Sequence, residues 1–380
     1  MQIDQIMQLG FNPDGIDSGD EYRGLAFLSL RIALKAFFST YRSINHLKKI
    51  EYDELKGMIK ENKPNSICCK AYQEAYTEAI IHFQHFIELI MKDLLKEKHI
   101  FLIVDDTKKC KTKILYKLLT GQTLTDDEEK DTKDISFNDS LKRLSELTTD
   151  DVFDPQVKVI VESHKIDIDR INDLRNKLLH RGRFILPYNA LDWLFGKTVL
   201  PLILKITSIP RYSSQGKEWK YRRLECDIDP INEIIKECSK NSIDAKKIAL
   251  LKELARAAYE NPLNDMRPYQ ADDADDAERQ LYSSENEEIK TKYEAYSGVD
   301  ISILKADHGD YIGRIDIKEC LVCGLKTMII HDWGDGKVPI FVNSPNVDVS
   351  CRCCSFEIHN NLSNPKKYGY SIEDFWSYED

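Results

Sequence analysis

The sequence lacks the features of a membrane or secreted protein. No uncharged apolar stretch of about 18 residues occurs, so no transmembrane helix is predicted. Residues 1–10 contain no basic segment followed by an apolar run, so no secretory leader is predicted. Glycine and proline are scarce, at 16 and 12 of 380 residues, which favours long helices over a turn-rich β fold. We therefore expect a cytoplasmic protein that does not bind a membrane.

A disulfide framework is also missing, although the chain has ten cysteines. Five of them fall between Cys320 and Cys354 instead of being spread along the chain. In a long chain without a secretory leader, such clustering predicts reduced thiols and a metal site.

Charge of one sign dominates only locally. The net charge of −10 argues against a general nucleic-acid coat protein. Between Arg170 and Arg223, however, there are twelve Lys and Arg against three Asp and Glu, a local net charge of +9. Between Ala271 and Asp310 the counts are four against twelve, a net charge of −8. The simplest explanation of the basic segment 170–223 is a solvated helix face. The other explanation is that this segment binds an anionic ligand.

Apolar periodicity predicts a mainly α fold for the first part of the chain. Hydrophobic residues are 42% of the sequence, enough for a substantial core. The strongest period predicts a long core helix over 70–98, preceded by a helix over 20–50. A third helix is expected from Phe137 to about Leu147, capped by Asn138 or Asp139.

Further helices are predicted downstream. Pro155 fits the first position of a helix, which we expect to break near His164 before a second helix ends at Gly182. Another apolar helix is predicted over 189–206, and Asp229 and Ser242 are expected to cap two shorter ones.

These patterns define five regions. They are a helical domain at 1–215 with its core at 70–210, additional helices at 216–262, an acidic linker at 263–310, a small β-rich zinc ribbon at 311–360, and a tail at 361–380. Within the ribbon, strands are expected near Tyr311 to Ile315 and over 327–330 and 338–342.

Two Cys-x2-Cys pairs carry the metal prediction. Cys320 and Cys323 are separated by 27 residues from Cys351 and Cys354. Tetrahedral Zn²⁺ takes four thiolates in structural sites, and four cysteines leave no open position for a catalytic water. The zinc is therefore expected to be structural. Cys353 is an alternative to Cys354 as the fourth ligand.

The segment that bears most directly on function is Arg175-Asn176 followed by His180. Asn176 and His180 are four residues apart and share a helix face, while Gly182 predicts that the helix ends just beyond them. A helix C-terminus favours an imidazolium, which can donate a proton to a leaving 5′-oxygen. Arg175 can neutralise charge on a pentacoordinate phosphate. With RNA's own 2′-hydroxyl as nucleophile, this chemistry requires no metal.

The Arg-Asn-x3-His segment, together with the preceding long helix that carries Phe83, Phe86, Ile87, Glu88, Lys92 and Leu95, resembles the HEPN superfamily. The resemblance covers about residues 70–210. It implies a helical bundle that forms a homodimer and joins two Arg-x4-6-His motifs at the interface. It also implies a metal-independent endoribonuclease, often a bacterial toxin or antiphage defence effector. Arg175, Asn176 and His180 would be catalytic, and Lys177, Arg181 and Arg183 would bind RNA.

Glu88 and Lys92 are four residues apart on the long helix. One interpretation is an exposed ion pair. The other is that this pair supports the site, with Glu88 orienting Arg175 or His180.

Two alternatives to a nuclease stay open from the sequence. In the first, a non-catalytic HEPN-like protein binds a nucleotide or RNA, or serves as an adaptor. In the second, the chain is a helical structural protein in which Arg175 pairs with Asp173 or Glu88 and His180 caps a carbonyl. In the nuclease and adaptor readings, the zinc ribbon is expected to contact a regulatory protein or a nucleic-acid trigger.

Overall fold

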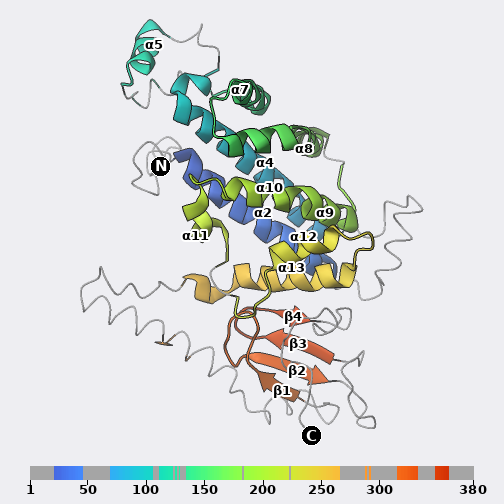
Figure 1. Ribbon diagram of the computed structural model, residues 1–380. Helices are drawn as coiled ribbons and strands as arrows, with labels where there is room; N and C mark the ends of the chain where they lie inside the picture. Colours follow the sequence, from blue (N-terminus) through green and yellow to red (C-terminus); the bar gives the residue numbers. More distant parts are fainter. Residues whose placement is uncertain are drawn as a thin grey trace, which may run out of the picture. The chain divides into compact units, whose positions relative to one another are not determined.

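The computed structural model describes residues 21–45, 69–105, 111–122, 125, 128, 134–181, 184–221, 224–265, 287–288, 291, 315–332 and 347–358 of the chain. These residues are mainly helical, and one antiparallel four-stranded sheet lies near the C-terminal end (Figure 1). They divide into two compact units. Unit 1 comprises Met1–Ala33, Glu78–Phe184 and Lys205–Trp219, and unit 2 comprises Leu34–Thr77, Ile185–Leu204 and Lys220–Asp380.

Unit 1 is helical. Its elements are the first part of α2 (Glu21–Asn45), most of α4 (Lys70–Lys98), η1 (Ile100–Leu102), α5 (Thr112–Leu119), α7 (Phe137–Thr149), α8 (Pro155–Arg181), the end of α10 (Leu200–Thr207), η4 (Ser213–Gln215) and α11 (Gly216–Trp219). Its core contains aromatic rings in tilted and edge-to-face contact, with Phe27 packed against Phe86 and Tyr212. The buried carboxylate of Asp93 accepts hydrogen bonds from Arg211 and from the Tyr212 hydroxyl.

Helices α4 and α8 run antiparallel, which two contacts establish. Lys98, at the end of α4, lies over the ring of Phe153 just before α8 begins. Fourteen residues earlier in α4, Gln84 donates a hydrogen bond to Asn172, far along α8. The C-terminal turns of α8 therefore lie beside the part of α4 that precedes Gln84.

Unit 2 combines helices with the sheet. It contains the end of α2, the start of α4, α9 (Tyr188–Leu194), a π-helical segment η3 (Phe195–Val199), the start of α10, α12 (Pro230–Cys238), α13 (Ala245–Glu260) and η5 (Pro262–Asp265). The sheet is a meander in the order β1 (Ile315–Lys318), β2 (Met328–Asp332), β3 (Val347–Cys351) and β4 (Glu357–Ile358). All neighbouring strands are antiparallel, with Ile330 paired to Val349 across β2 and β3.

Several sequence-based expectations about the helices are confirmed. The core helix is α4, with the predicted bounds, and Pro155 begins α8. Asp229 caps α12 by accepting hydrogen bonds from the amides of Ile231 and Asn232. The prediction of a mainly α chain with a small β-rich C-terminal module is confirmed at that level.

Other expectations about helix ends are wrong. α8 is continuous through His164, because that side chain is held by polar neighbours, Asp167 on the same helix and Lys205 on α10. Ser136, rather than Asn138 or Asp139, caps α7, since its hydroxyl accepts from the Asp139 amide.

The predicted cap at Ser242 and the predicted uniform helix over 189–206 also need correction. Asp244, rather than Ser242, caps α13, because its carboxylate accepts hydrogen bonds from the amides of Lys246 and Lys247. The segment around 189–206 contains a π-helical turn between two α-helices.

Some predictions fall on residues outside the described ones. They are most of the acidic linker 263–310, the expected strand over 338–342 and the tail 361–380. No helix among the described residues is both long and apolar enough to cross a membrane.

Candidate functional site

The four predicted metal ligands lie together in unit 2. The Sγ atoms of Cys320, Cys323, Cys351 and Cys354 are all within 4.8 Å of one another, and all four residues are buried. Cys320 and Cys354 are 3.6 Å apart at sulfur, and Cys323 and Cys351 are 3.7 Å apart. Four sulfurs around one Zn²⁺ at about 2.3 Å would be about 3.8 Å from each other. The cluster therefore fits a structural zinc site.

Each cysteine pair is shaped by the turn that contains it. In the first turn the Val322 amide donates to the Cys320 sulfur, and in the second the Cys353 amide donates to the Cys351 sulfur, both at 3.4 Å. The residue after each pair has a left-handed backbone, with φ of 72° at Gly324 and 57° at Ser355. Cys354, rather than Cys353, belongs to the four-sulfur cluster.

The thiols of the cluster are linked by hydrogen bonds. Bonding from Cys320 lowers the pKa of Cys351 to about 7, and the same donor lowers the pKa of Cys323. Thiolates are the form that binds zinc, and metal binding displaces the remaining protons. Four cysteine ligands would therefore fill the tetrahedral coordination of the metal and leave no open position for a water or a substrate.

In unit 1, Arg175 is half-buried on the face of α8 that approaches α4. Its guanidinium donates to the Asn176 side chain at 3.0 Å, and its buried Nε has no hydrogen-bond partner within the described residues. Neither Asp173 nor Glu88 pairs with it among the described contacts, unlike the expectation for a purely structural arginine.

The neighbouring stretch of α4 is polar. Gln84 bridges Glu88 and Asn172, and Asn172 continues to Asn138 on α7. Lys92 pairs with Glu88 at 3.0 Å and with Asp134 at 3.3 Å.

The ion pair of Glu88 and Lys92 differs from the exposed pair that the sequence suggested. The Lys92 side chain is only 9% exposed. The Lys92 ammonium is therefore largely shielded from solvent, between the carboxylates of Glu88 and Asp134, whose side chains are 22% and 45% exposed.

Sequence reasoning missed two histidines of this stretch, His82 and His85. The antiparallel packing places Arg175 beside the turn of α4 that contains His82, whose Nδ1 is likewise buried without a partner in the described part of the chain. Burial lowers the pKa of His85; Glu88 opposes this shift, and His82, Lys92 and Arg175 add to it. His85 also shares a 2.9 Å hydrogen bond with Ser29. The signal in the sequence was their spacing of three with Glu88, which puts all three on one helix face.

His180 is exposed in the last turns of α8 and makes no hydrogen bond among the described residues. Among the contacts of the described residues, none joins it to Arg175. The two predicted catalytic side chains therefore differ in setting: the arginine turns inward toward α4, and the histidine faces solvent.

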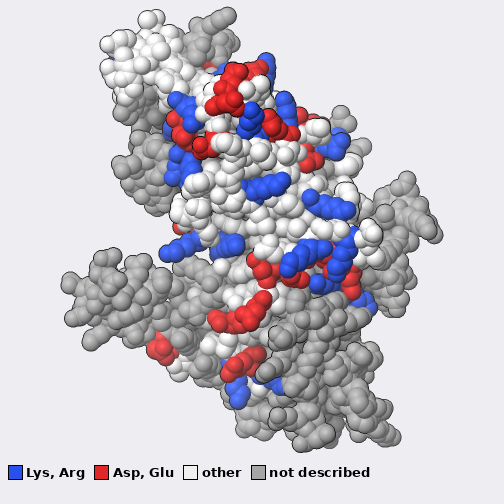
Figure 2. Space-filling view, in the orientation of Figure 1, with Lys and Arg blue, Asp and Glu red and all other residues white. Residues whose placement is uncertain are grey.

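Of the three predicted RNA-binding residues, the structure describes the side chain of Lys177. It is exposed, and its Nζ lies 5.3 Å from the ring centroid of Phe184. Phe184 is itself 42% exposed and is a third residue that the sequence-based prediction missed. Arg181 belongs to α8 without a described side chain, and Arg183 lies outside the described residues. On the face seen in Figure 2, Lys and Arg side chains are interspersed with Asp and Glu.

The chain was compared with protein-family models, with curated proteins and with solved structures, and none of the three comparisons finds a match.

Proposed function

We propose that this protein is a metal-independent endoribonuclease of the HEPN type, acting as a toxin or antiphage defence effector. The observation that carries the proposal is Arg175-Asn176-x3-His180 in the last turns of a long helix that packs against a polar stretch of α4. Four cysteines support a structural zinc rather than a catalytic one. The cytoplasm is the proposed location.

The proposed reaction is attack of an RNA 2′-oxygen on the adjacent phosphorus. One imidazole removes the 2′-hydroxyl proton, and a protonated imidazole donates a proton to the 5′-oxygen as the P–O5′ bond breaks. The products are a 2′,3′-cyclic phosphate and a free 5′-hydroxyl. Arg175 stabilises the negative charge that develops on the phosphorane oxygens. Lys177, Arg181 and Arg183 would hold neighbouring phosphates.

Two copies of the chain complete the proposed site. A single histidine serves poorly as both base and acid in one in-line displacement, whereas two copies of His180 across a two-fold axis supply both roles. The exposure of His180 leaves it available to a second protomer. Val159 and Ile166, at 56% and 66% exposure, precede it by twenty-one and fourteen residues on the same helix. This spacing places the two exposed apolar side chains on the same face of α8 as His180.

Cleavage of total cellular RNA by the zinc-loaded protein in magnesium-free buffer tests the proposal. We expect 2′,3′-cyclic phosphate ends with the wild type, and a loss of at least about a hundredfold in rate for Arg175→Ala and His180→Ala. Strong chelators should be avoided during the assay, because they compete for the zinc held by the cysteines.

Arg170→Ala is the matched control, since Arg170 is exposed on the same helix five residues before Arg175. It should cleave RNA at nearly the wild-type rate. Undiminished cleavage by the Arg175→Ala and His180→Ala variants would contradict the proposal.

One observation favours a second candidate, an RNA-binding or nucleotide-binding adaptor without catalysis. Arg175 and His180 are not in contact within one chain, so a monomer has no assembled pair. A protein that stays monomeric and shifts RNA in a gel without cleaving it would support this candidate.

A further inference from the structure

Among the buried charged side chains of helix α13 are Arg256 and Glu253, which are almost completely buried. Arg256 has no exposed surface, and Glu253, one turn before it, is 1% exposed. Two hydrogen bonds join the guanidinium to the Glu253 carboxylate, at 2.5 and 2.8 Å. An ion pair with so little water around it is stable only if its remaining donors and acceptors also find partners.

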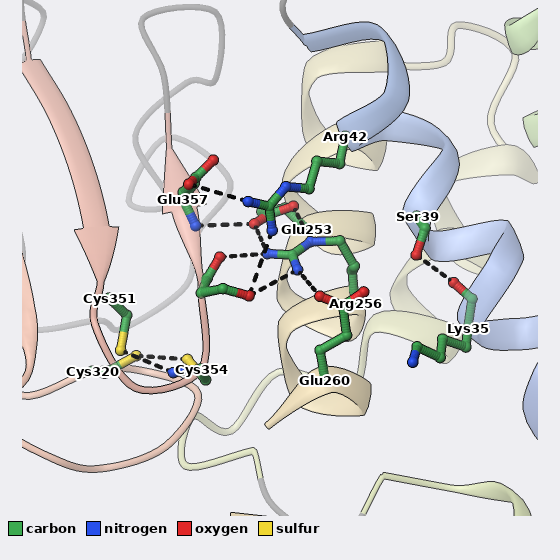
Figure 3. A network of polar contacts seen from close by, with 11 residues as sticks. Lys35, Ser39, Arg42, Glu253, Arg256, Glu260, Cys320, Cys351, Cys354 and Glu357 are labelled. Carbon is green, nitrogen blue, oxygen red and sulfur yellow. Dashed lines mark hydrogen bonds and ion pairs between the residues drawn. The ribbon is translucent and has the colours of Figure 1, made fainter. Parts of the chain in front are cut away.

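One of those partners is the Glu260 carboxylate, one turn further along α13, and the others come from the chain that follows the second cysteine turn (Figure 3). Arg256 donates to the Ser355 carbonyl at 2.5 Å and to the Ser355 hydroxyl at 3.1 Å. In return, the Glu357 amide donates to Glu253 at 2.9 Å. Arg42 from α2 also donates to these two residues, to the Ser355 hydroxyl at 3.5 Å and to the Glu357 carboxylate at 3.3 Å.

The position of Ser355 depends on the cysteine cluster. It follows Cys354 directly, and its left-handed backbone turns the carbonyl toward α13. The first cysteine turn is held as well, since the Glu225 amide donates to the Val322 carbonyl and a Cβ on Gly324 would meet the Glu225 side chain at 2.9 Å. Small metal-bound modules take most of their folding free energy from the metal.

We propose that Arg256 and Glu253 transmit occupancy of the cysteine site to helix α13. With zinc bound, the segment after Cys354 is fixed and satisfies the buried ion pair. Without zinc, this segment loses its anchor, and Arg256 and Glu253 keep each other but lose the Ser355 carbonyl and the Glu357 amide. The ribbon is then an integral part of unit 2 whose metal controls the stability of a helix, rather than an arm that is free to bind on its own.

The proposal predicts that zinc removal acts beyond the sheet. The full-length protein is stripped with a zinc chelator, returned to buffer, and compared with the same sample after zinc is added back. Hydrogen–deuterium exchange is followed in peptides from α13. We expect exchange of the α13 amides to accelerate by roughly tenfold or more without zinc and to recover when zinc returns. Unchanged exchange in α13 would overturn the proposal, whatever happens in the sheet.

A matched pair of double variants shows whether the effect passes through Arg256. Glu253→Gln/Arg256→Met removes the charges that contact the second cysteine turn. Asp192→Asn/Lys252→Met removes another buried ion pair, between Lys252 of α13 and Asp192 of α9, whose described contacts do not include that turn. We expect zinc-dependent exchange in α13 to be largely lost in the first variant and retained in the second. Equal zinc dependence in both variants would also overturn the proposal.

Discussion

Buried charge is the main feature of unit 2 at the scale of single residues. Lys252 is fully buried on α13, donates to Asp192 at 2.5 Å, and lies 4.1 Å from the ring centroid of Tyr188. Burial raises the pKa of Asp192 and lowers that of Lys252, because desolvation disfavours both charged forms. Such pairs are costly to break from one side, since the remaining charge is left uncompensated.

Cys238 gives a pH-dependent prediction. Burial raises the pKa of its thiol to about 12, and the Asp192 and Glu237 carboxylates add to the effect. In the unfolded chain a thiol ionises near pH 8.5. The folded state therefore keeps a proton that the unfolded state loses, so this contribution to stability is full below about pH 8.5 and is lost as pH rises toward 12.

We expect the urea midpoint of the wild type to fall more steeply between about pH 8 and pH 10.5 than that of Cys238→Ala, which has no thiol to titrate at residue 238.

The partly exposed Cys69 serves as an internal reference for thiol alkylation. In the folded protein at about pH 8.5, Cys69 should react with iodoacetamide well before Cys238. Urea midpoints of the wild type and of Cys238→Ala that fall in parallel with pH would contradict the prediction for Cys238.

At the scale of elements, the π-helical turn between α9 and α10 depends on one glycine. Gly196 is buried, and a Cβ at this position would lie 2.2 Å from the sulfur of Cys238 on α12. The close approach of the Cys238 side chain to the backbone at residue 196 therefore leaves no room for a side chain there.

Gly196→Ala should lower the free energy of unfolding by about 1–3 kcal/mol, because the overlap outweighs the better helix propensity of alanine. Gly216→Ala is the control, since a Cβ there would meet nothing within 4 Å. It should leave stability unchanged or raise it by about 0.5 kcal/mol. Urea unfolding followed by circular dichroism distinguishes the two, and equal midpoints would show that α12 moves to accommodate the new methyl group.

At the scale of the whole molecule, each unit is assembled from segments that are distant in sequence. Helices α2 and α4 each contribute residues to both units. The proposed nuclease adds a further level, because the site would be completed only by a second copy of the chain.

Mixed dimers test whether the active site needs His180 from both copies of the chain. Wild-type and His180→Ala subunits are unfolded together, refolded at equal amounts and assayed on RNA. If cleavage requires both copies of His180, only wild-type homodimers are active, about a quarter of all dimers formed by random association. Activity near one half of that of an all-wild-type sample of the same total protein would mean that each protomer cleaves by itself.

The sequence could predict α4 and the cysteine ligands because both depend on local spacing. Apolar residues at a helical period define α4, and the two Cys-x2-Cys pairs are recognisable from chain positions alone. The break expected in α8 was wrong because His164 reads as a polar interruption until its partners Asp167 and Lys205 are known.

The sequence by itself determined the helical class of the chain, the small β-rich end and the four sulfur ligands. Only the tertiary structure decided which charges are buried. In a linear pattern Glu253 and Arg256 look like a solvated pair one turn apart, and only folding brings the Ser355 carbonyl and the Glu357 amide to them. The tertiary structure also decided that Arg175 lies toward α4 and that His180 faces solvent, because the packing of α8 against its neighbours sets the direction of each side chain.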